Sequence, residues 1–483
     1  MIFEKSALFK QESYIDGEWI SSPDTLEVID PSSQQLVGTV PSLGEQETLQ
    51  AIHAAHRAFL PWKNFTAKER SVILKNWHKL IVDYTNDLAV IMSKEQGKPL
   101  AEAEREVVSC AAYVEWFAEE AKRVYGDTIP MSQKGKRIVV LKEPIGVCAA
   151  ITPWNFPLST ITRKAAPALA AGCTVIVKPS SYTPFSALAL AVLADKAGFP
   201  PGVINVITGK AEILGKVLTS SHLVKKISFT GSTEVGRVLM RDSSDSLKKI
   251  SLELGGHAPF IVFEDADIEL AVTEAMISKF RNSGQTCVCA NRFLVQESIF
   301  EEFSMKFIEM VRSQLVVGPG LQMDRNQGPL IDGKAVEKVE YQIQDALAKG
   351  ARLATGGKRI AGKGFFFEPT VILDVTSEMR IAQEETFGPV APLFRFKTED
   401  EALRIANDSQ YGLAAYFFTK DLARVWRMTE RLECGMVGIN TGILSSEAAP
   451  FGGTKDSGMG REGSKYGIEE YLELKYMCIG GLT

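Results

Sequence analysis

The sequence predicts an α/β protein with two parallel-sheet domains and a small β extension. Three observations support this prediction. The chain has 483 residues, whereas a single hydrophobic core stops growing beyond about 250–300 residues. Apolar runs of strand length alternate with helix-like segments from residue 146 to 240, and again from 257 to 440. Strands that are apolar throughout are typical of a parallel sheet covered by helices on both faces.

The expected elements of the first region follow in a regular order. Residues 45–122 carry apolar side chains at spacings of three and four, which predicts amphipathic helices. Residues 136–144 (KRIVVLKEP) read as a strand. Alternation then gives strands at 146–152, 174–180, 202–208 and 225–231, with helices at 157–172, 184–198, 211–220 and from 232. Ligands bind at the carboxyl ends of such strands, so we expect a Rossmann-type nucleotide-binding domain here.

The second region begins at HAPFIVFEDAD and is a second predicted α/β domain. It contains helices at 267–282 and 300–315 and strands at 292–296 and 435–440. The final alternating segment, 466–480, has no sequence neighbour to pair with. We expect this segment to pair with residues 136–144 or with another subunit.

The composition excludes several classes of protein. A net charge of −5 without a long Lys or Arg run argues against nucleic acid as the main partner. No apolar run reaches the roughly 18–20 residues of a membrane span, and the N-terminus lacks the apolar segment of a signal peptide. Seven cysteines, an odd count, fit a reducing compartment. We therefore expect a cytoplasmic protein with no membrane partner.

The stretch FRNSGQTCVCANR, residues 280–292, places Cys287 and Cys289 two positions apart. Metal sites generally need C-x2-C pairs or histidines at set spacings, and the chain has five histidines and no HExxH. We therefore expect no metal. A nucleophilic cysteine needs local help to form its thiolate, and a buried structural cysteine is an equally good interpretation of these residues alone.

Three more candidate site positions lie beside predicted strands. Gly231 in TGSTEVG precedes a helix whose N-terminus favours a phosphate, although a plain tight turn is the alternative because no GxGxxG occurs. Asn155 in TPWNFP is placed to donate to a developing oxyanion or to cap a helix. Glu253 in SLELGG is a candidate general base with a pKa raised by burial, or a carboxylate paired with an unseen Lys or Arg.

Seven motifs occur in the order found in the aldehyde dehydrogenase superfamily, which the chain resembles over essentially its entire length. They are TPWNFP, KPS, FTGSTEVG, LELGG, GQTCVCANR, EETFGPV and PFGGTKDSGMGREG. The likeness is closer to the succinate-semialdehyde dehydrogenase branch, on NFPLSTITRKAAPALAAGCTVIVKPS, FRNSGQTCVCANR and REGSKYGIEEYLELKYMCIG. It implies a dinucleotide-binding domain (1–127 and 146–255), a catalytic domain (256–454), an oligomerisation arm (128–145 and 455–483), and a homodimer or homotetramer.

The resemblance also implies catalytic roles. Cys287 resembles the family's nucleophile, which adds to the aldehyde carbon and becomes a thioester after hydride transfer. Asn155 and the backbone N–H of Cys287 resemble the oxyanion hole. Glu253 resembles the base that activates the hydrolytic water, which favours hydrolysis over acyl transfer to coenzyme A.

Cofactor residues carry over in the same way. Contacts to the adenosine ribose, the pyrophosphate and the nicotinamide ribose and ring are implied for Thr152, Trp154, Lys178, Gly231, Ser232, Glu385 and Phe387. NAD-preferring relatives commonly carry Glu three residues after the lysine, and this chain has Ser181 there. Because no carboxylate repels a 2′-phosphate at that position, we expect NADP to be preferred and NAD to be usable.

Substrate selection is expected to rest on Arg163, Arg281 and Ser445, which would grip a carboxylate at the far end of the aldehyde. Structural arginines at helix ends are the alternative. Phe451 and Trp426 are further expected pocket walls. The implied substrate is succinate semialdehyde, with glutarate semialdehyde as the alternative. In the resembling proteins a cysteine at the position of Cys289 can close a disulfide with the nucleophile, whereas a small buried side chain is the plain alternative here.

Overall fold

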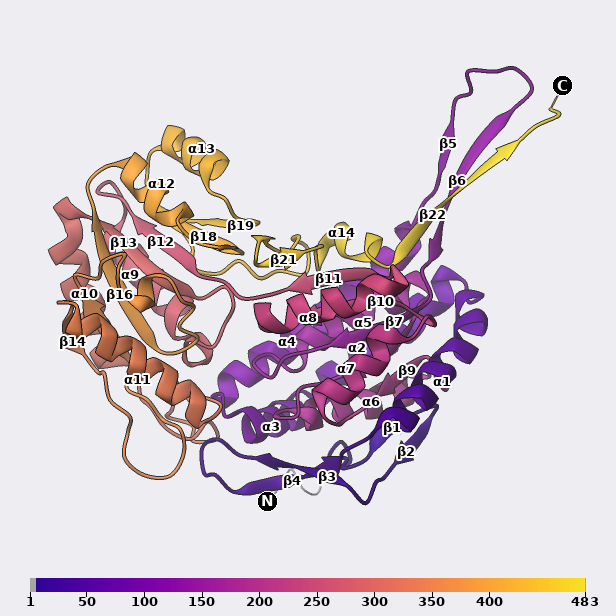
Figure 1. Ribbon diagram of the computed structural model, residues 1–483, viewed down its shortest axis with the longest axis horizontal. Coiled ribbons are helices and arrows are strands. Elements are labelled where there is room, and N and C mark those ends of the chain that lie inside the picture. Colours follow the sequence, from indigo (N-terminus) through magenta and orange to yellow (C-terminus); the bar gives the residue numbers. More distant parts are fainter. Residues whose placement is uncertain (1–5, 483) are drawn as a thin grey trace.

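The computed structural model describes residues 6–482 and contains two large sheets and a projecting arm (Figure 1). The first sheet has the strand order β2-β1-β9-β8-β7-β10-β11-β21. Its strands are β2 (Glu18–Ile20), β1 (Ser13–Ile15), β9 (Ile204–Val206), β8 (Thr174–Lys178), β7 (Val147–Ile151), β10 (Val224–Thr230), β11 (Lys249–Glu253) and β21 (Gly458–Met459). The five neighbouring strands β9, β8, β7, β10 and β11 are parallel, as the apolar sequences predicted for this region.

Helices cover both faces of this sheet. One face packs against α1 (Glu45–Lys63), α7 (Ala211–Ser220) and α8 (Thr233–Ser243). The other packs against α2 (Ala67–Asp83), α3 (Thr85–Gln96), α4 (Leu100–Glu120), α5 (Ser159–Ala171) and α6 (Pro184–Ala197). Successive residues of β7 divide between the two cores, Val147 and Ala149 in one and Cys148 and Ala150 in the other, because side chains alternate along a strand.

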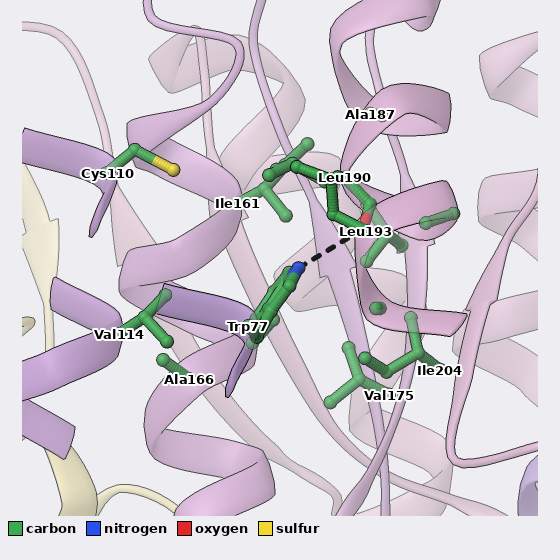
Figure 2. Close-up of a cluster of buried hydrophobic side chains, with 14 of the residues drawn as sticks. Trp77, Cys110, Val114, Ile161, Ala166, Val175, Ala187, Leu190, Leu193 and Ile204 are labelled. Carbon is green, nitrogen blue, oxygen red and sulfur yellow. Dashed lines mark hydrogen bonds between the residues drawn. The ribbon is translucent and has the colours of Figure 1, made fainter. Parts of the chain in front are cut away.

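Trp77 of α2 lies at the centre of the larger core (Figure 2). Its side chain is 2% exposed, and its indole N–H donates to the Leu190 carbonyl of α6 at 3.2 Å. The indole also meets Phe199 edge-on at 5.6 Å. A buried Trp with its one donor satisfied contributes packing area without an unpaired polar group.

The second sheet has the order β14-β15-β16-β13-β12-β18-β19. Its strands are β14 (Arg352–Thr355), β15 (Thr370–Leu373), β16 (Val390–Phe396), β13 (Ala290–Gln296), β12 (Ala258–Val262), β18 (Ala414–Phe418) and β19 (Met436–Ile439). Helices α9 (Ile268–Phe280) and α10 (Phe300–Gln314) cover one face, and α11 (Gly333–Ala348), α12 (Glu399–Asn407) and α13 (Leu422–Arg431) cover the other.

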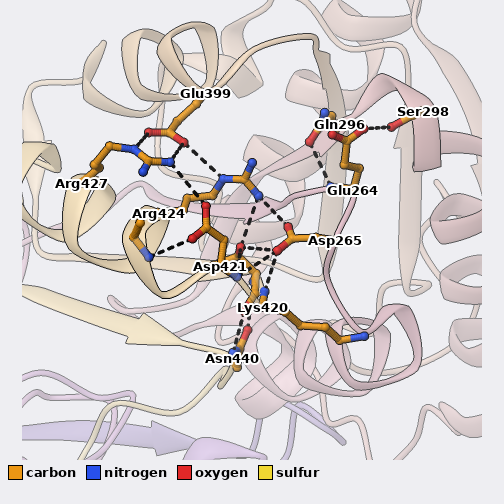
Figure 3. A network of polar contacts seen from close by, with 12 residues as sticks. Glu264, Asp265, Gln296, Ser298, Glu399, Lys420, Asp421, Arg424, Arg427 and Asn440 are labelled. Atoms are coloured by element: carbon orange, nitrogen blue, oxygen red, sulfur yellow. Dashed lines mark hydrogen bonds and ion pairs between the residues drawn. The ribbon is translucent and has the colours of Figure 1, made fainter.

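A polar network fixes α12 and α13 on the outside of this second sheet (Figure 3). Arg427 makes a two-pronged contact with Glu399, with both N–O distances 2.8 Å. Arg424 bridges Glu399 and Asp265. Trp426 lies between these arginines on α13, is 64% exposed and does not line the cavity described below, so the expectation that it forms a pocket wall was wrong.

The arm is a three-stranded antiparallel sheet that extends from the body (Figure 1). It contains β5 (Asp127–Ile129), β6 (Arg137–Pro144) and β22 (Leu472–Ile479). The eight residues of β22 pair with β6, from Leu472 opposite Pro144 to Ile479 opposite Arg137. Pairing of the final segment with residues 136–144 is thus confirmed, whereas the domain boundaries stay a prediction.

The remaining elements are short. Besides several 3-10 helices of three or four residues, they are β3 (Thr25–Ile29) paired with β4 (Leu36–Pro41), β17 (Tyr411–Gly412) paired with β20 (Thr454–Lys455), and α14 (Ser464–Glu469). The sequence patterns did not reveal that β1, β2 and β21 extend the first sheet.

Candidate active site

A cavity of about 770 Å³ lies between the two sheets and gathers residues from across the chain. Twelve residues singled out from the sequence line it: Trp154, Asn155, Arg163, Gly231, Ser232, Glu253, Arg281, Cys287, Glu385, Phe387, Ser445 and Phe451. Thr152, Lys178, Ser181 and Cys289 are not among its lining residues. Chemical groups separated by up to about 300 positions therefore share one enclosed space.

Cys287 is presented by a loop with an unusual backbone. Asn282, Ser283 and Gly284 have φ values of 51°, 56° and 74°, in the left-handed region that side chains disfavour. A Cβ on Gly284 would lie 2.1 Å from the Gly388 carbonyl oxygen, so this position needs glycine. The loop therefore has one tightly fitted path from the end of α9 to the thiol.

Two buried amide side chains hold this loop in place. Asn282 accepts a hydrogen bond from Gln96 at 3.0 Å and donates to the Asn155 carbonyl, also at 3.0 Å. Gln285 donates to the Asn282 carbonyl and accepts from the Ile331 N–H. Sequence reasoning missed these supporting residues, although their polar side chains within FRNSGQTC were the available signal.

The Cys287 thiol is protonated at rest because its surroundings disfavour the thiolate. Burial raises its pKa to about 12, and the negative charge of Glu385 adds to the increase. Arg163 and Arg281 act in the opposite direction. Both guanidiniums line the same cavity as Cys287, and their positive charges favour the thiolate.

Asn155 lies in the turn between β7 and α5, with its amide beside the nucleophile loop. Its side-chain N–H donates to the Gln285 carbonyl at 3.0 Å, and its oxygen accepts from the Phe156 N–H. An amide nitrogen carries two hydrogens, so one remains for a ligand in the cavity. The backbone N–H of Cys287 also makes no hydrogen bond with another residue in the 6–482 range.

A buried ion pair below this turn fixes its position. Lys98 pairs with Glu106 and also donates to the Asn155 carbonyl at 2.8 Å. Glu106 accepts from the Leu158 and Ser159 N–H groups, which satisfies the N-terminus of α5. Helix α5 begins at Ser159 rather than at Pro157 as expected, and no local pattern in the sequence pointed to the Lys98–Glu106 ion pair.

Glu253 ends β11 and projects into the cavity as an unpaired carboxylate. Both of its oxygens are buried without a hydrogen-bond partner. Burial raises its pKa well above the usual value, and the nearby charge of Glu462, itself paired with Lys164, adds to the increase. The alternative of a carboxylate paired directly with Lys or Arg is not what the structure shows.

The carboxyl edge of the first sheet offers groups suited to a dinucleotide. Lys178, at the end of β8, is 5% exposed, and its ammonium forms no hydrogen bond or ion pair with any residue from 6 to 482. The Thr152 hydroxyl is buried without a partner. Ser232 caps α8 by accepting from the Val235 N–H, and Gly231 precedes it on the cavity wall. Ser181 lies exposed three residues after Lys178.

Glu385 and Phe387 approach the cavity from the second domain. Glu385 accepts a hydrogen bond from the Gly256 N–H at 3.0 Å, and burial raises its pKa to about 7. Phe387 has a φ of 53° and meets Trp154 edge-on at 5.6 Å. Among the expected cofactor residues, Glu385 and Phe387 therefore share the cavity with Trp154, Gly231 and Ser232.

Aromatic rings and unpaired guanidiniums form another part of the wall. The Arg163 guanidinium lies over the rings of Tyr113 and Phe451, at 4.8 and 4.6 Å, and its buried Nε has no hydrogen-bond partner. Arg281 lies over Phe156 at 5.7 Å, and its guanidinium likewise bonds to no residue among those described. Ser445 lines the cavity beside them.

Cys289 turns away from the cavity. Its side chain is 1% exposed, and its thiol donates to the Lys279 carbonyl at 3.4 Å. Both Cys287 and Cys289 are free thiols. A disulfide between them would require Cys289 to leave this contact, and that pairing stays a prediction.

The architecture and the cavity have the make-up of an oxidoreductase that combines a dinucleotide with a nucleophilic thiol. The chain matches the aldehyde dehydrogenase family model over residues 19–477. It therefore belongs to the aldehyde dehydrogenase family and is an NAD(P)-dependent enzyme.

Several relatives are similar over their whole length. The chain is 58% identical to an Escherichia coli succinate-semialdehyde dehydrogenase named for NADP(+), covering 99% of this chain and 100% of the relative. It is 56% identical to a glutarate-semialdehyde dehydrogenase of Pseudomonas putida, with the same coverages. A crystal structure of an E. coli NADP-dependent enzyme superposes with a TM-score of 0.97 at 58% identity, covering 98% of both chains.

No helix within residues 6–482 is long and apolar enough to span a bilayer.

Proposed function

We propose that this enzyme oxidises a short aldehyde that carries a carboxylate at its far end. Succinate semialdehyde is the proposed substrate, and glutarate semialdehyde is the alternative. The observation that carries the proposal is the pair Arg163 and Arg281, whose guanidiniums lie in the cavity near Cys287 without a carboxylate partner. Buried cations are generally paired, and a planar guanidinium matches the geometry of a carboxylate.

The same cavity supplies the groups for chemistry at the aldehyde. Glu253 or a nearby water takes the Cys287 proton, and the thiolate adds to the aldehyde carbon. Asn155 and the Cys287 N–H then stabilise the oxyanion. A bound NAD(P) would supply the hydride acceptor, and loss of the hydride from the adduct would leave a thioester on Cys287. Glu253 removes a proton from water, the hydroxide displaces the thiolate, and the carboxylic acid product leaves.

Residues on both sides of the cavity are proposed to hold the dinucleotide. Lys178, Ser181, Thr152, Gly231 and Ser232 would contact the adenosine and phosphate groups, and Trp154, Glu385 and Phe387 the nicotinamide end. NADP is the proposed preferred form, since Lys178 lacks a partner and Ser181 presents a hydroxyl rather than a carboxylate. The NADP(+)-named relative supports this choice.

The relatives do not separate the two candidate substrates. Succinate- and glutarate-semialdehyde dehydrogenases are matched at similar identity, and a 3-sulfolactaldehyde dehydrogenase of P. putida is also 56% identical. All three names describe an aldehyde with an anionic group. One methylene changes affinity by only about 1–3 kcal/mol, so chain length must be measured.

Assembly through the arm is proposed as well. Strands β22 and β5 are the two edges of the arm sheet, and Leu474 and Tyr476 of β22 are 68% and 62% exposed. Unpaired edges and exposed apolar side chains favour contact with a second copy, in a homodimer or homotetramer. The seven free thiols accord with a cytoplasmic location.

The test compares succinate semialdehyde, glutarate semialdehyde and butanal, each with NADP and NAD, by absorbance at 340 nm. We expect the two acid aldehydes to exceed butanal by at least about tenfold in kcat/KM. Arg281→Ala should abolish most of this difference by raising KM for the acids, since the charged contact contributes about 1.5–3 kcal/mol. Equal kcat/KM values for butanal and the acids in the native enzyme would refute carboxylate selection.

A further inference from the structure

The surroundings of Lys178 contain an acidic residue that sequence comparison around Ser181 does not reveal. Strand β9 runs parallel to β8, with Val206 opposite Val177, and the Ile207 N–H donates to the Val177 carbonyl at 3.0 Å. The chain then turns at Gly209, where φ is 155°, and helix α7 begins at Ala211. The first turn of α7 therefore lies over the same sheet edge as Lys178.

Glu212 occupies that first turn. Its side chain is exposed and forms no hydrogen bond or ion pair within residues 6–482. Its negative charge favours the protonated form of Lys178. Burial lowers the pKa of Lys178 to about 8, and Glu212 is the group that opposes this decrease. An ammonium and a carboxylate, each without a hydrogen-bond or ion-pair partner among residues 6–482, thus lie at the same edge of the first sheet.

On the proposed assignment of Lys178 to the adenosine ribose, we propose that Glu212 limits the use of NADP. A 2′-phosphate beside Lys178 would add about 1.5–2 negative charges next to this carboxylate, whereas a ribose hydroxyl can donate a hydrogen bond to it. Relatives with Glu at the position of Ser181 discriminate against NADP there. Glu212, which lies in the connection after β9, therefore restores part of that discrimination. The inference depends on the dinucleotide binding at this edge.

A simpler role for Glu212 is stabilisation of α7 through the helix dipole. This role predicts a small loss of stability on substitution and no change in coenzyme choice. Glu45, an exposed acid in the first turn of α1, provides a matched control. Glu45→Gln removes the same charge from the first turn of another helix that packs on the same face of the first sheet.

The experiment measures binding without turnover. Adenosine 2′,5′-bisphosphate, adenosine 5′-phosphate, NADP and NAD are titrated calorimetrically at pH 7 into the native protein, Glu212→Gln and Glu45→Gln. Thermal melts of all three proteins report folding. Repeating the titrations at higher salt tests whether the effect is electrostatic, because exposed charges are screened.

Glu212→Gln should raise the affinity for NADP relative to NAD by about fivefold, the scale of one exposed charge pair. The affinity for adenosine 2′,5′-bisphosphate should increase relative to that for adenosine 5′-phosphate by a similar factor, and this increase should be smaller at high salt. An unchanged ratio, or an equal gain in Glu45→Gln, would overturn the role of Glu212. Failure of the native protein to bind either dinucleotide would instead overturn the cofactor assignment, and this proposal with it.

Discussion

Replacing Glu253 by Gln gives the most direct test of the catalytic arrangement. Because neither carboxylate oxygen has a hydrogen-bond partner, the substitution breaks no contact and nearly preserves the side-chain shape. It also removes a buried carboxyl group whose pKa is raised well above the usual value. The protein should fold with undiminished stability, so a change in rate will report chemistry.

General-base catalysis contributes about 10²–10⁴ in rate. We expect Glu253→Gln to lower steady-state kcat at least about a hundredfold, equivalent to about 2.7 kcal/mol. Thioester formation should be less affected. The buried Cys287 thiol must lose its proton for this step, but a water molecule can accept that proton in place of Glu253. A stopped-flow trace at 340 nm should then show a burst approaching one equivalent per Cys287, and intact-protein mass spectrometry should detect the acylated enzyme.

The pH profile supplies an independent check. Glu253 must be deprotonated to activate water, so kcat of the native enzyme should rise with pH through the raised pKa, well above the range of an ordinary glutamate. Glu462→Gln removes a negative neighbour, which should lower the pKa of Glu253 and move the limb to lower pH. A loss below threefold in Glu253→Gln, with no acylated enzyme, would refute the reasoning.

Four other substitutions test separate parts of the molecule. Asn155→Ala should lower kcat by about 10²–10³ if its amide binds the oxyanion, and a loss under threefold would reject that role. Trp77→Ala should cost about 3–5 kcal/mol in urea unfolding without changing KM; an unchanged midpoint would contradict the packing argument. Leu474→Arg should shift sedimentation toward smaller species if β22 lies at a subunit contact. Hydrogen peroxide should inactivate the enzyme reversibly, and Cys289→Ala should reduce the recovery; identical behaviour of both proteins would exclude the disulfide.

The sequence predicted those parts of the fold in which pattern and local structure coincide. The parallel strands around residues 147–151 and 174–178 are buried on both faces, so their apolar runs stand out. The pairing of β22 with β6 was predictable because an alternating segment needs a partner. Strand β21 has only two residues, and its pairing with β11 depends on contacts between distant parts of the chain.

The candidate site was likewise predictable only where local motifs carry the signal. Motif resemblance located twelve of the residues that line the cavity, but not the groups that position them. Lys98, in the loop between α3 and α4, and Glu106 of α4 look like ordinary surface charges in the sequence, and only tertiary packing buries them as a pair. Glu212 lies 34 positions after Lys178, so no local pattern relates the two charges. Such relationships arise from strand order, which a single sequence specifies only indirectly.

The partnership between β6 and β22 also bears on how the protein is made. Domains generally fold in order during synthesis, and β22 follows the entire second sheet along the chain. The edge of β6 that pairs with β22 therefore stays unpaired until the ribosome has synthesised the nucleophile loop and the rest of the second sheet. If the arm joins subunits, assembly is postponed until each copy carries a complete catalytic cavity. Truncated translation products would then be excluded from the oligomer without any separate quality-control step.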